Sequence, residues 1–582
     1  MLSTAESGKM NKAEKLICVL LGTVLAWYLF TQVQNSKKQQ AANAVVQTNV
    51  VETAAAPEVA RDVKDIRDVK DEEEVTSTAE ASVPAVPERI VVLENDEVKL
   101  ELSTWGAVVK GVTLKKYAKN CGEVSEENPA VVMDFADSPL GAGEGIVVCE
   151  VVSQSVDAVV FKGPAGSRTI TLEAGYRISF KDAAFGSDTI SLGAMRMGDS
   201  KNDLLSVDSW AQDAGKGKPG VIHHCEGESP LKGYLAGSIG GCGGSKSAAG
   251  LPVAATVEYP GAQTWIAAKN RFFVTALVKC DETVKGFVAT VKRDVNAANY
   301  RPESVTVKAR LDQSRQVRET TFYVGPKKQA LLWDLGMKDV MEFGMWRWLC
   351  YPLVWILNLF YGWIPNFGVA IILLTVAVRL VFWPLTRKST EGMKRMQEIQ
   401  PLMKEIQAKY KDNPQRLQQE TWALYRDKKV NPMSSCLPML IQIPVFIALF
   451  NVLRSAVELR YAPFLWISDL SEPEALFASW FPFGGLNILP IAMAATMVLQ
   501  TALQPSTGDK QQQKMMMVFM PVMMLFMFYS FPSALSLYWF LSNILSIVQM
   551  WLIRRETAKK QALEATEIID PPTPTRQQRR HS

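Results

Sequence analysis

The apolar run 367–385 (FGVAIILLTVAVRLVFWPL) carries a single charge, Arg379. A run of this length is typical of a transmembrane helix, and a charge inside one costs about 2.5–3.5 kcal/mol on insertion scales, so its default interpretation is functional. The alternative is that Arg379, near the end of the run, extends its side chain to the membrane surface. Thr375 and Trp383 lie four residues before and after it and share its helix face, which favours a polar groove.

Several segments of the sequence have the length and apolar character of membrane spans. They are 16–33, 365–385, 433–458, 486–504, 514–531 and 533–553. The aromatic-rich segment 343–364 predicts a helix lying at the membrane interface, with a full span as the alternative. The predicted fold class is a multi-domain membrane protein with six transmembrane helices, five of which form an α-helical core.

Basic residues predict the orientation of these spans. Segment 386–432 contains eleven Lys or Arg residues and the tail 554–582 begins with a basic cluster, whereas the loop 459–485 contains one basic residue. By the positive-inside rule the segment and the tail are cytoplasmic and the loop is periplasmic. Six spans then also place residues 1–15 and the loop 505–513 in the cytoplasm.

A lysine-rich stretch precedes the first apolar segment, 16–33, which agrees with a cytoplasmic N-terminus. We favour an uncleaved anchor over a cleaved signal peptide, because Trp27, Tyr28 and Phe30 stand where a small-residue cleavage site would be needed. Residues 34–87 are rich in Ala, Val, Gln and Glu with mixed-charge repeats. Such a composition buries little apolar surface and predicts a flexible linker.

Residues 88–330 show short β-branched runs in which polar and apolar residues alternate, separated by turn residues. This pattern predicts an antiparallel β-sandwich, which the orientation of the anchor places in the periplasm. Five cysteines in this region leave the question of disulfides open. The adjacent His223 and His224 are interpreted as part of a loop rather than a metal site, because the chain has only three histidines.

The basic segment 386–432 predicts a cytoplasmic hairpin of two amphipathic helices. Apolar residues from Ile399 to Tyr410 recur at helical spacing, Asp-Asn-Pro at 412–414 breaks the chain, and a second helix extends to Lys429. A solvated connector would not need this much paired helix. We therefore favour a role in docking or at a lipid surface.

Polar residues are spread through the apolar segments of the second half. Each alone is best explained by a hydrogen bond between helices, but together with a buried charge they favour a hydrophilic groove. The residues concerned are Thr375, Arg379, Gln442, Asn451, Ser536, Ser542 and Asn543. This half contains no nucleotide-binding motif, catalytic triad or metal-ligand cluster, so the sequence predicts a protein that is not an enzyme and uses no cofactor or metal.

Three stretches of the sequence closely resemble the YidC/Oxa-type membrane protein insertases. They are GVAIILLTVAVRLVFWPLTRKS (368–389), IQPLMKEIQAKYKDNPQRLQQETWALYRDKKVNPMSSCLPMLIQIPVFIALF (399–450) and FPSALSLYWFLSNILSIVQMWLIRR (531–555). Outside them, TWIAAKNRFF (264–273) and FYVGP (322–326) resemble the large periplasmic domain of Gram-negative members, a sandwich similar to carbohydrate-binding mutarotase-like folds.

The resemblance implies an insertase and chaperone of the bacterial inner membrane. Such a protein receives hydrophobic nascent segments in a hydrophilic groove and releases them sideways into the lipid bilayer, alone or with the Sec translocon, and assists their folding. It also implies that the hairpin first meets the substrate and that the basic tail assists contact with the ribosome.

The resemblance further implies which residues form the groove. Arg379 would be its charge, Thr375 and Gln442 would line it, and Tyr538 and Trp539 would supply an aromatic wall where some members have two tyrosines. Asn543, one helical turn beyond that pair, belongs to the same expected site.

Two other functional classes have weaker support. A secondary transporter would need internal repeats and a coupling carboxylate in its spans, and the sequence shows neither. An exported carbohydrate-active enzyme would need a pair of catalytic acids in the sandwich, and no sequence motif supports such a pair.

Overall fold

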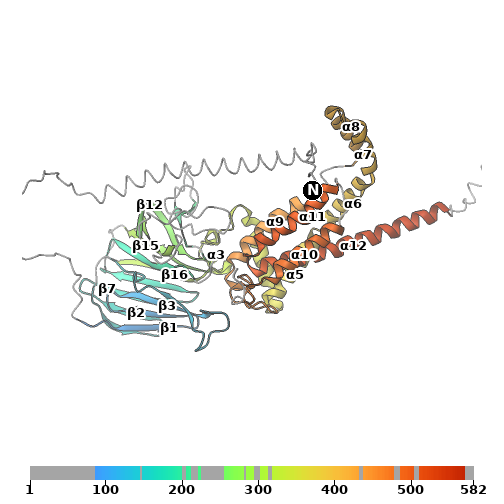
Figure 1. Ribbon diagram of the computed structural model, residues 1–582. Helices are drawn as coiled ribbons and strands as arrows, with labels where there is room; N and C mark the ends of the chain where they lie inside the picture. Colours follow the sequence, from blue (N-terminus) through green and yellow to red (C-terminus); the bar gives the residue numbers. More distant parts are fainter. Residues whose placement is uncertain are drawn as a thin grey trace, which may run out of the picture.

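The structure, a computed structural model, combines a β-rich domain with a bundle of helices beside it (Figure 1). It describes residues 86–143, 147–185, 187–198, 203, 205–211, 220–224, 254–280, 284–293, 302–311, 317–430, 437–477, 485–503 and 510–569. The predicted N-terminal segment, the anchor, nearly all of the linker and the end of the basic tail therefore lie outside the described residues.

The β-rich domain begins with a small antiparallel sheet in the order β1-β2-β3-β4. Its strands are β1 (Ile90–Glu94), β2 (Val98–Ser103), β3 (Val108–Ala118) and β4 (Ala130–Asp134). Buried and exposed residues alternate along β1, as the period of a half-buried strand requires. The apolar face of the small sheet joins the same core as the large one.

The large sheet contains the other twelve strands, in the order β5-β6-β7-β8-β16-β13-β12-β14-β15-β9, with β10 and β11 attached through β12. The strands are β5 (Glu150–Gln154), β6 (Ala158–Lys162), β7 (Ser167–Glu173), β8 (Arg177–Ala183), β9 (Thr189–Arg196), β10 (Ser206–Ala211), β11 (Gly220–His223), β12 (Ala254–Lys269), β13 (Phe273–Cys280), β14 (Val284–Arg293), β15 (Pro302–Leu311) and β16 (Val317–Pro326). All strand pairings among the described residues are antiparallel, which confirms the antiparallel, β-rich character predicted for this region.

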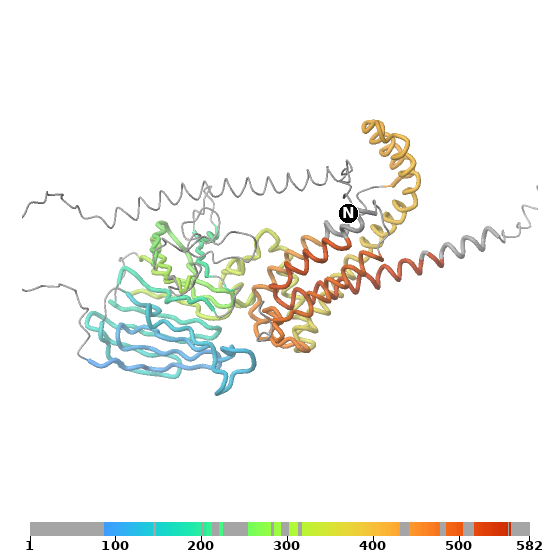
Figure 2. Tube along the Cα trace, in the orientation of Figure 1, coloured from blue at the N-terminus to red at the C-terminus, as the bar shows by residue number. Residues whose placement is uncertain are grey.

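Short helical turns lead from the last strand into the bundle. The chain passes through α3 (Gln329–Asp334), η1 (Lys338–Met341) and η2 (Gly344–Trp346) before α4 (Arg347–Trp363). Figure 2 traces this passage from the β-rich domain to the helices. One face of α4 is buried and the other exposes Trp348, Trp355 and Trp363, the pattern of an amphipathic helix.

The remaining helices form the bundle and its projections. They are α5 (Phe367–Val381), α6 (Trp383–Glu398), α7 (Gln400–Lys409), α8 (Pro414–Asp427), α9 (Leu437–Ser455), η4 (Val457–Leu459), α10 (Ile488–Leu503), α11 (Lys510–Phe528) and α12 (Ser533–Ile569). Helix α5 packs on α4 and α12, while α10 packs on α11 and α12. Helices α7 and α8 project away from the bundle (Figure 1).

Local sequence explains where several helices begin and end. The Asn366 side chain accepts a hydrogen bond from the Val369 amide and caps α5, and Asn413 caps α8 in the same way. Helix α5 ends before Phe382, and α6 continues at an angle of 59° with a proline in its first turn. The predicted span 365–385 is therefore bent near its end.

Within the described residues, one helix, Ser533–Glu556, is long and apolar enough to cross a membrane. The bent pair Phe367–Val381 and Trp383–Glu398 passes the same test if it is counted as one span. Three shorter apolar helices, Gln442–Ser455, Ile488–Leu503 and Met517–Phe528, lie in the other predicted spans.

Candidate functional site

Arg379 lies on α5 and reaches across to α12. Its Nε donates a 3.1 Å hydrogen bond to the Ser542 hydroxyl, and a terminal nitrogen donates to the same hydroxyl and, at 2.9 Å, to the Ser542 carbonyl oxygen. Among the described residues, no carboxylate lies within ion-pair distance of this guanidinium. The charge is therefore held by neutral oxygens and lacks a counter-ion in this part of the chain.

Gln442 on α9 reaches α12 one turn before Ser542. Its Nε2 donates a 3.0 Å hydrogen bond to the Tyr538 hydroxyl. Tyr538 and Ser542 are four residues apart on α12 and so share one face of that helix. We call Arg379, Ser542, Tyr538 and Gln442 the Arg379 cluster, because together they join the apolar helices α5, α9 and α12 through polar groups.

Two residues predicted to belong to the groove have partners elsewhere. Thr375 is fully buried, and its hydroxyl donates a 2.6 Å hydrogen bond to the Ile371 carbonyl oxygen of its own helix. Asn543 faces α10, where its amide nitrogen donates 3.3 Å hydrogen bonds to the Met493 carbonyl oxygen and the Thr496 hydroxyl. Both side chains therefore contribute to helix structure and packing in this conformation.

Trp539 lies in an aromatic group between α9, α11 and α12. Its ring meets Phe446 and Phe528 edge to face, with centroids 4.8 Å and 5.3 Å apart, and Phe531 packs on Phe528 at 5.4 Å. Edge-to-face pairs of this kind are favourable beyond the area they bury. Trp539 thus stands beside Tyr538 in the sequence but points to the aromatic group rather than to Arg379.

Ser542 was one of the polar residues that favoured a groove, but it is the cluster member that the family resemblance did not assign to it. Its place four residues after Tyr538 was the available signal, since these positions share a helix face. The same face continues through Ser546 and Gln549, which are also buried. The Gln549 Nε2 has no hydrogen-bond partner in the described structure, so a polar stripe extends along α12 beyond the cluster.

A second group of charges lies in the β-rich domain, around the fully buried Lys269. The Lys269 ammonium forms ion pairs with Asp208 and, at 2.8 Å, with Glu342, and it donates a 2.8 Å hydrogen bond to the Val340 carbonyl oxygen. The His223 Nδ1 lies 3.1 Å from the other Asp208 oxygen. We call these residues the Lys269 cluster; its acids come from β10 and from the end of η1.

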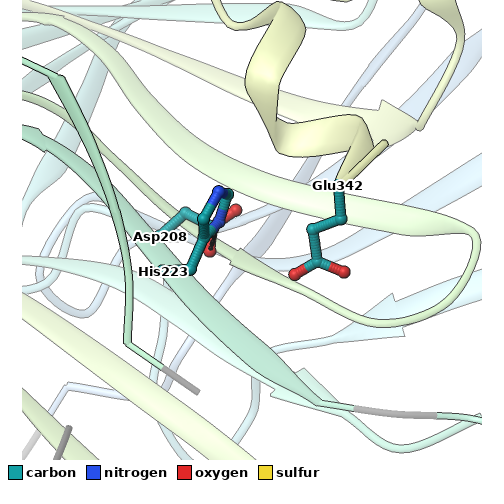
Figure 3. Close-up of side chains that lie close together, drawn as sticks. All are labelled: Asp208, His223 and Glu342. Carbon is teal, nitrogen blue, oxygen red and sulfur yellow. Dashed lines mark hydrogen bonds and ion pairs between the residues drawn. The ribbon is translucent and has the colours of Figure 1, made fainter. Parts of the chain in front are cut away.

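The Lys269 cluster shares donor atoms with metal sites but already contains its cation. The ligand atoms of Asp208, His223 and Glu342 lie within 4.8 Å of one another, and Figure 3 shows their side chains gathered from separate elements. The Lys269 ammonium stands among them and forms ion pairs with both acids. The predicted loop at His223 is wrong, because this residue ends β11 and pairs with Asp208 across the ladder.

Burial and charge act against each other in this cluster. Burial alone would raise the pKa of Asp208, but the Lys269 charge and the His223 hydrogen bond outweigh it and hold that pKa below its usual value. The hydrogen bond to Asp208 raises the pKa of His223. Burial lowers the pKa of His224 to about 4, so this ring is neutral at pH 7.

Arg271, in the turn between β12 and β13, connects the β-rich domain to the bundle. Its Nε donates a 2.8 Å hydrogen bond to the Arg454 carbonyl oxygen at the end of α9, and its terminal nitrogens contact Glu472 and, at 2.6 Å, the Ser471 carbonyl oxygen. The Glu472 carbonyl oxygen in turn accepts from the Ser533 amide at the start of α12. One buried guanidinium thus joins the domain to two bundle helices.

Comparison with known proteins gives two family matches. The model described as "60Kd inner membrane protein" matches residues 359–561, which contain the Arg379 cluster, and the model described as "YidC periplasmic domain" matches residues 251–356. The second match covers β12 to β16 and the passage into α4.

Curated relatives agree with both matches. "Membrane protein insertase YidC" of Syntrophobacter fumaroxidans is 41% identical over 300 residues, covering 50% of this chain and 54% of the relative. The protein of the same name from Syntrophus aciditrophicus is 46% identical over 239 residues, covering 40% of this chain and 42% of the relative. The chain thus matches about half the length of these curated relatives.

A crystal structure of an active YidC insertase with its first transmembrane domain resolved aligns with 80% of this chain and 92% of that chain, at 18% identity and a TM-score of 0.33. A likeness this weak adds nothing to the two family matches and the curated relatives. The two family matches adjoin along residues 251–561, and the curated relatives are named YidC, so this chain is similar to the YidC insertases both in its helical part and in the part that matches their periplasmic domain.

Proposed function

We propose that the protein is a membrane protein insertase and chaperone. It receives hydrophobic segments of newly made membrane proteins beside the Arg379 cluster, releases them sideways into the inner membrane and assists their folding. The observation that carries this proposal is the Arg379 cluster itself, a guanidinium held by neutral oxygens between apolar helices. The names of the curated relatives support it.

The physical basis is the cost of moving polar chain through lipid. A guanidinium without a counter-ion attracts acidic residues in the part of a substrate that must cross, and this attraction is stronger than in water because the surroundings are apolar. Hydroxyl and amide groups beside it give water and substrate backbone somewhere to bond. No covalent step is required, so the proposed role is insertion rather than enzymatic catalysis.

The proposed topology has six spans, formed by the anchor 16–33 and the helices around α5, α9, α10, α11 and α12. Both termini are cytoplasmic, the β-rich domain is periplasmic and α4 lies at the membrane interface. The basic charge of 386–432 and the lower charge of 459–485 support this orientation. The exposed tryptophans of α4 are the residue type that favours the interface.

The proposed partners are nascent membrane proteins, the Sec translocon, the ribosome and the lipid bilayer. Segment 386–432 forms the cytoplasmic hairpin in this proposal, and it meets the substrate or the ribosome together with the basic tail 554–582. In support, α8 exposes Trp422, and the segment 386–432 to which it belongs is rich in Lys and Arg, a combination suited to contact with polypeptide or anionic surfaces.

The test is crosslinking of ribosome-held nascent chains to the full-length protein in membranes. A photoreactive side chain is placed at Gln442 or Trp539, and a matched control probe at Val548, an exposed position of α12 outside the cluster. We expect nascent membrane proteins to crosslink to Gln442 and Trp539 and only weakly to Val548. Equal labelling at all three positions, or normal membrane protein insertion after depletion of the protein, would contradict the proposal.

A further inference from the structure

A cavity of about 1010 Å³ lies between the β-rich domain and the ends of the bundle helices. Its β side is formed by β4, the end of β9 and the start of β13, and its helical side by the segment between α9 and α10 together with Asn487 and Tyr529. Ligand pockets usually have volumes of about 300–1,000 Å³, so this cavity has room for several residues of a peptide.

Strand β4 turns an open edge toward this cavity. In the described structure β4 pairs with β3 alone, and all five of its residues line the cavity. The Phe135 amide donates to the Lys110 carbonyl oxygen, and hydrogen-bonded pairs alternate along an antiparallel ladder. Val132 and Asp134 therefore direct their N–H and C=O groups away from β3.

Strand β9, on the opposite wall, also ends in an open edge. Gly141 and Ala142 bond to Ser191 and cover the first part of β9, but this cover stops before Ala194. From Ala194 to Gly198 the chain lines the cavity. The Arg196 carbonyl oxygen there already accepts a 3.3 Å hydrogen bond from the Asn270 side chain. The Asn270 amide therefore occupies an acceptor on β9 to which an added strand could otherwise donate.

The charges around the cavity are largely engaged with one another. Arg196 pairs with Asp137 at 3.0 Å and lies 3.7 Å from Asp134, while Asp203 accepts a hydrogen bond from the Arg271 amide and Glu472 pairs with the Arg271 side chain. A compact ion would find little free charge here. The open groups are those of the backbone, which bind an extended chain with little regard to its sequence.

The cavity and the Arg379 cluster lie along the same helix. Tyr529 and Ser530, which line the cavity, immediately precede α12, and α12 begins at Ser533. Tyr538 follows five residues later, which is about 8 Å along a helix. A substrate helix lying beside the cluster would therefore bring the chain that follows it close to the open edge of β4.

We propose that this cavity binds an extended segment of polypeptide by strand addition to β4. The segment is the extramembrane part of a substrate, directly next to the helix that is being inserted, so the inference rests on the proposed function. Main-chain hydrogen bonds to the edge of β4 hold the segment, and Phe272, Phe273 and Tyr461 supply apolar surface for its side chains. The β-rich domain thereby keeps newly translocated chain extended and apart from other chains.

The test uses the full-length protein in proteoliposomes and a substrate arrested during insertion. The substrate carries a benzophenone label in the segment that follows its inserted helix, and the crosslinked residues are identified by mass spectrometry. We expect crosslinks to residues 129–134. Val132→Pro removes one outward N–H and should lower their yield about fivefold, the effect of one lost backbone hydrogen bond of about 1 kcal/mol.

The matched control is Val92→Pro on β1, the opposite edge of the same sheet. The Asn95 amide donates to the Val98 carbonyl oxygen, so by the same alternation Val92 also points its N–H outward, and Val92 does not line the cavity. Its crosslink yield should equal that of the unsubstituted protein. Equal losses in both variants, or no loss with Val132→Pro, would overturn the proposal.

A second label, within the inserted helix, separates this inference from the proposed function. If that label reaches Tyr538 or Trp539 while the first label never reaches 129–134 in the unsubstituted protein, strand addition is wrong and insertion stands. If neither label crosslinks, both ideas fail. A crosslink from 129–134 to a second copy of this chain in the absence of substrate would mean that the edge is a dimer contact, which also overturns the inference.

Discussion

The two regions of the molecule treat a buried cation in opposite ways. In the β-rich domain, Lys269 has Asp208 and Glu342 within ion-pair distance. In the bundle, Arg379 has the hydroxyl and carbonyl oxygens of Ser542. A cation that is paired with fixed acids stabilises the fold and attracts no further anion, whereas a cation held by neutral oxygens can still attract an anion that arrives from outside.

The largest effect on stability is expected from removing Lys269, the buried cation that is paired with fixed acids. Lys269→Met leaves Asp208 buried without its main partner, and we expect the β-rich domain to lose about 3–5 kcal/mol of stability. Denaturant unfolding of the full-length protein, followed by hydrogen exchange in β10 and β12, measures this loss. Lys292→Met removes an exposed lysine of β14 and should change stability by less than about 0.5 kcal/mol. Similar effects of the two substitutions would contradict a structural role for Lys269.

Lys327 is a second buried lysine in the same region, and it has no ion pair among the described residues. Burial, and after it the Lys269 charge, lower the pKa of Lys327 from 10.5 to about 8. Below pH 8 the folded protein must hold an unfavourable charge, so Lys327→Met should raise its stability by about 2–3 kcal/mol at pH 7.

The pH dependence of that gain provides its control. Between pH 8 and 10.5 the unfolded chain binds more protons at Lys327 than the folded chain, so the unsubstituted protein becomes more stable as pH rises. The advantage of Lys327→Met should therefore be complete below pH 8 and vanish near pH 10.5. A gain that stays constant across this window would show that packing, not charge, is responsible.

Arg379→Ala removes the cation that has no acid partner among the described residues, and its effect is measured on insertion rather than on stability. We expect insertion of substrates with acidic translocated segments to fall about fivefold, the effect of an attraction of about 1 kcal/mol, and insertion of neutral ones to fall less. Arg379→Lys keeps the charge and should retain most of the activity. Insertion of matched acidic and neutral substrates into proteoliposomes is the measurement, and equal losses for both would argue against an electrostatic role.

Ser542→Ala should have the smallest effect. The substitution removes the hydroxyl but leaves the Ser542 carbonyl oxygen, which still accepts a hydrogen bond from Arg379. We expect insertion of acidic substrates to change by about twofold, since one of the three hydrogen bonds from Arg379 to Ser542 remains and the charge is kept. Ser546→Ala, one turn further along α12, should leave insertion unchanged. A larger effect at Ser546 than at Ser542 would move the centre of the polar stripe away from Arg379.

Sequence patterns predicted the features that are determined by residues close together in the chain. Alternation of polar and apolar residues indicated the β-rich domain, and the apolar runs indicated the helices around Arg379. Pairing between distant strands, such as β8 with β16, could not be read from local patterns. The Lys269 cluster was missed for the same reason, since Asp208, Lys269 and Glu342 are far apart in the sequence.

Helical spacing also predicted which residues share a helix face, but it did not predict the hydrogen-bond partner of each side chain. Thr375 lies one turn from Arg379, yet its hydroxyl bonds to its own helix, a competition that threonine always offers in helices. Asn543 directly follows Ser542, and a rotation of about 100° per residue turns it toward α10 instead. The choice between such partners is made by the packing of neighbouring helices, which a single sequence does not contain.

The contacts of Lys269 and Arg271 with the passage into the bundle have a consequence for protein engineering. A shortened protein that starts after residue 330 would keep Glu342, Glu472 and the carbonyl oxygens at the end of α9 but lose both cations that bind them. The helices would then expose acids and unpaired carbonyl groups at one end. The two regions are therefore poor candidates for exchange as independent modules, and a helical fragment would need new basic residues at that end to take their place.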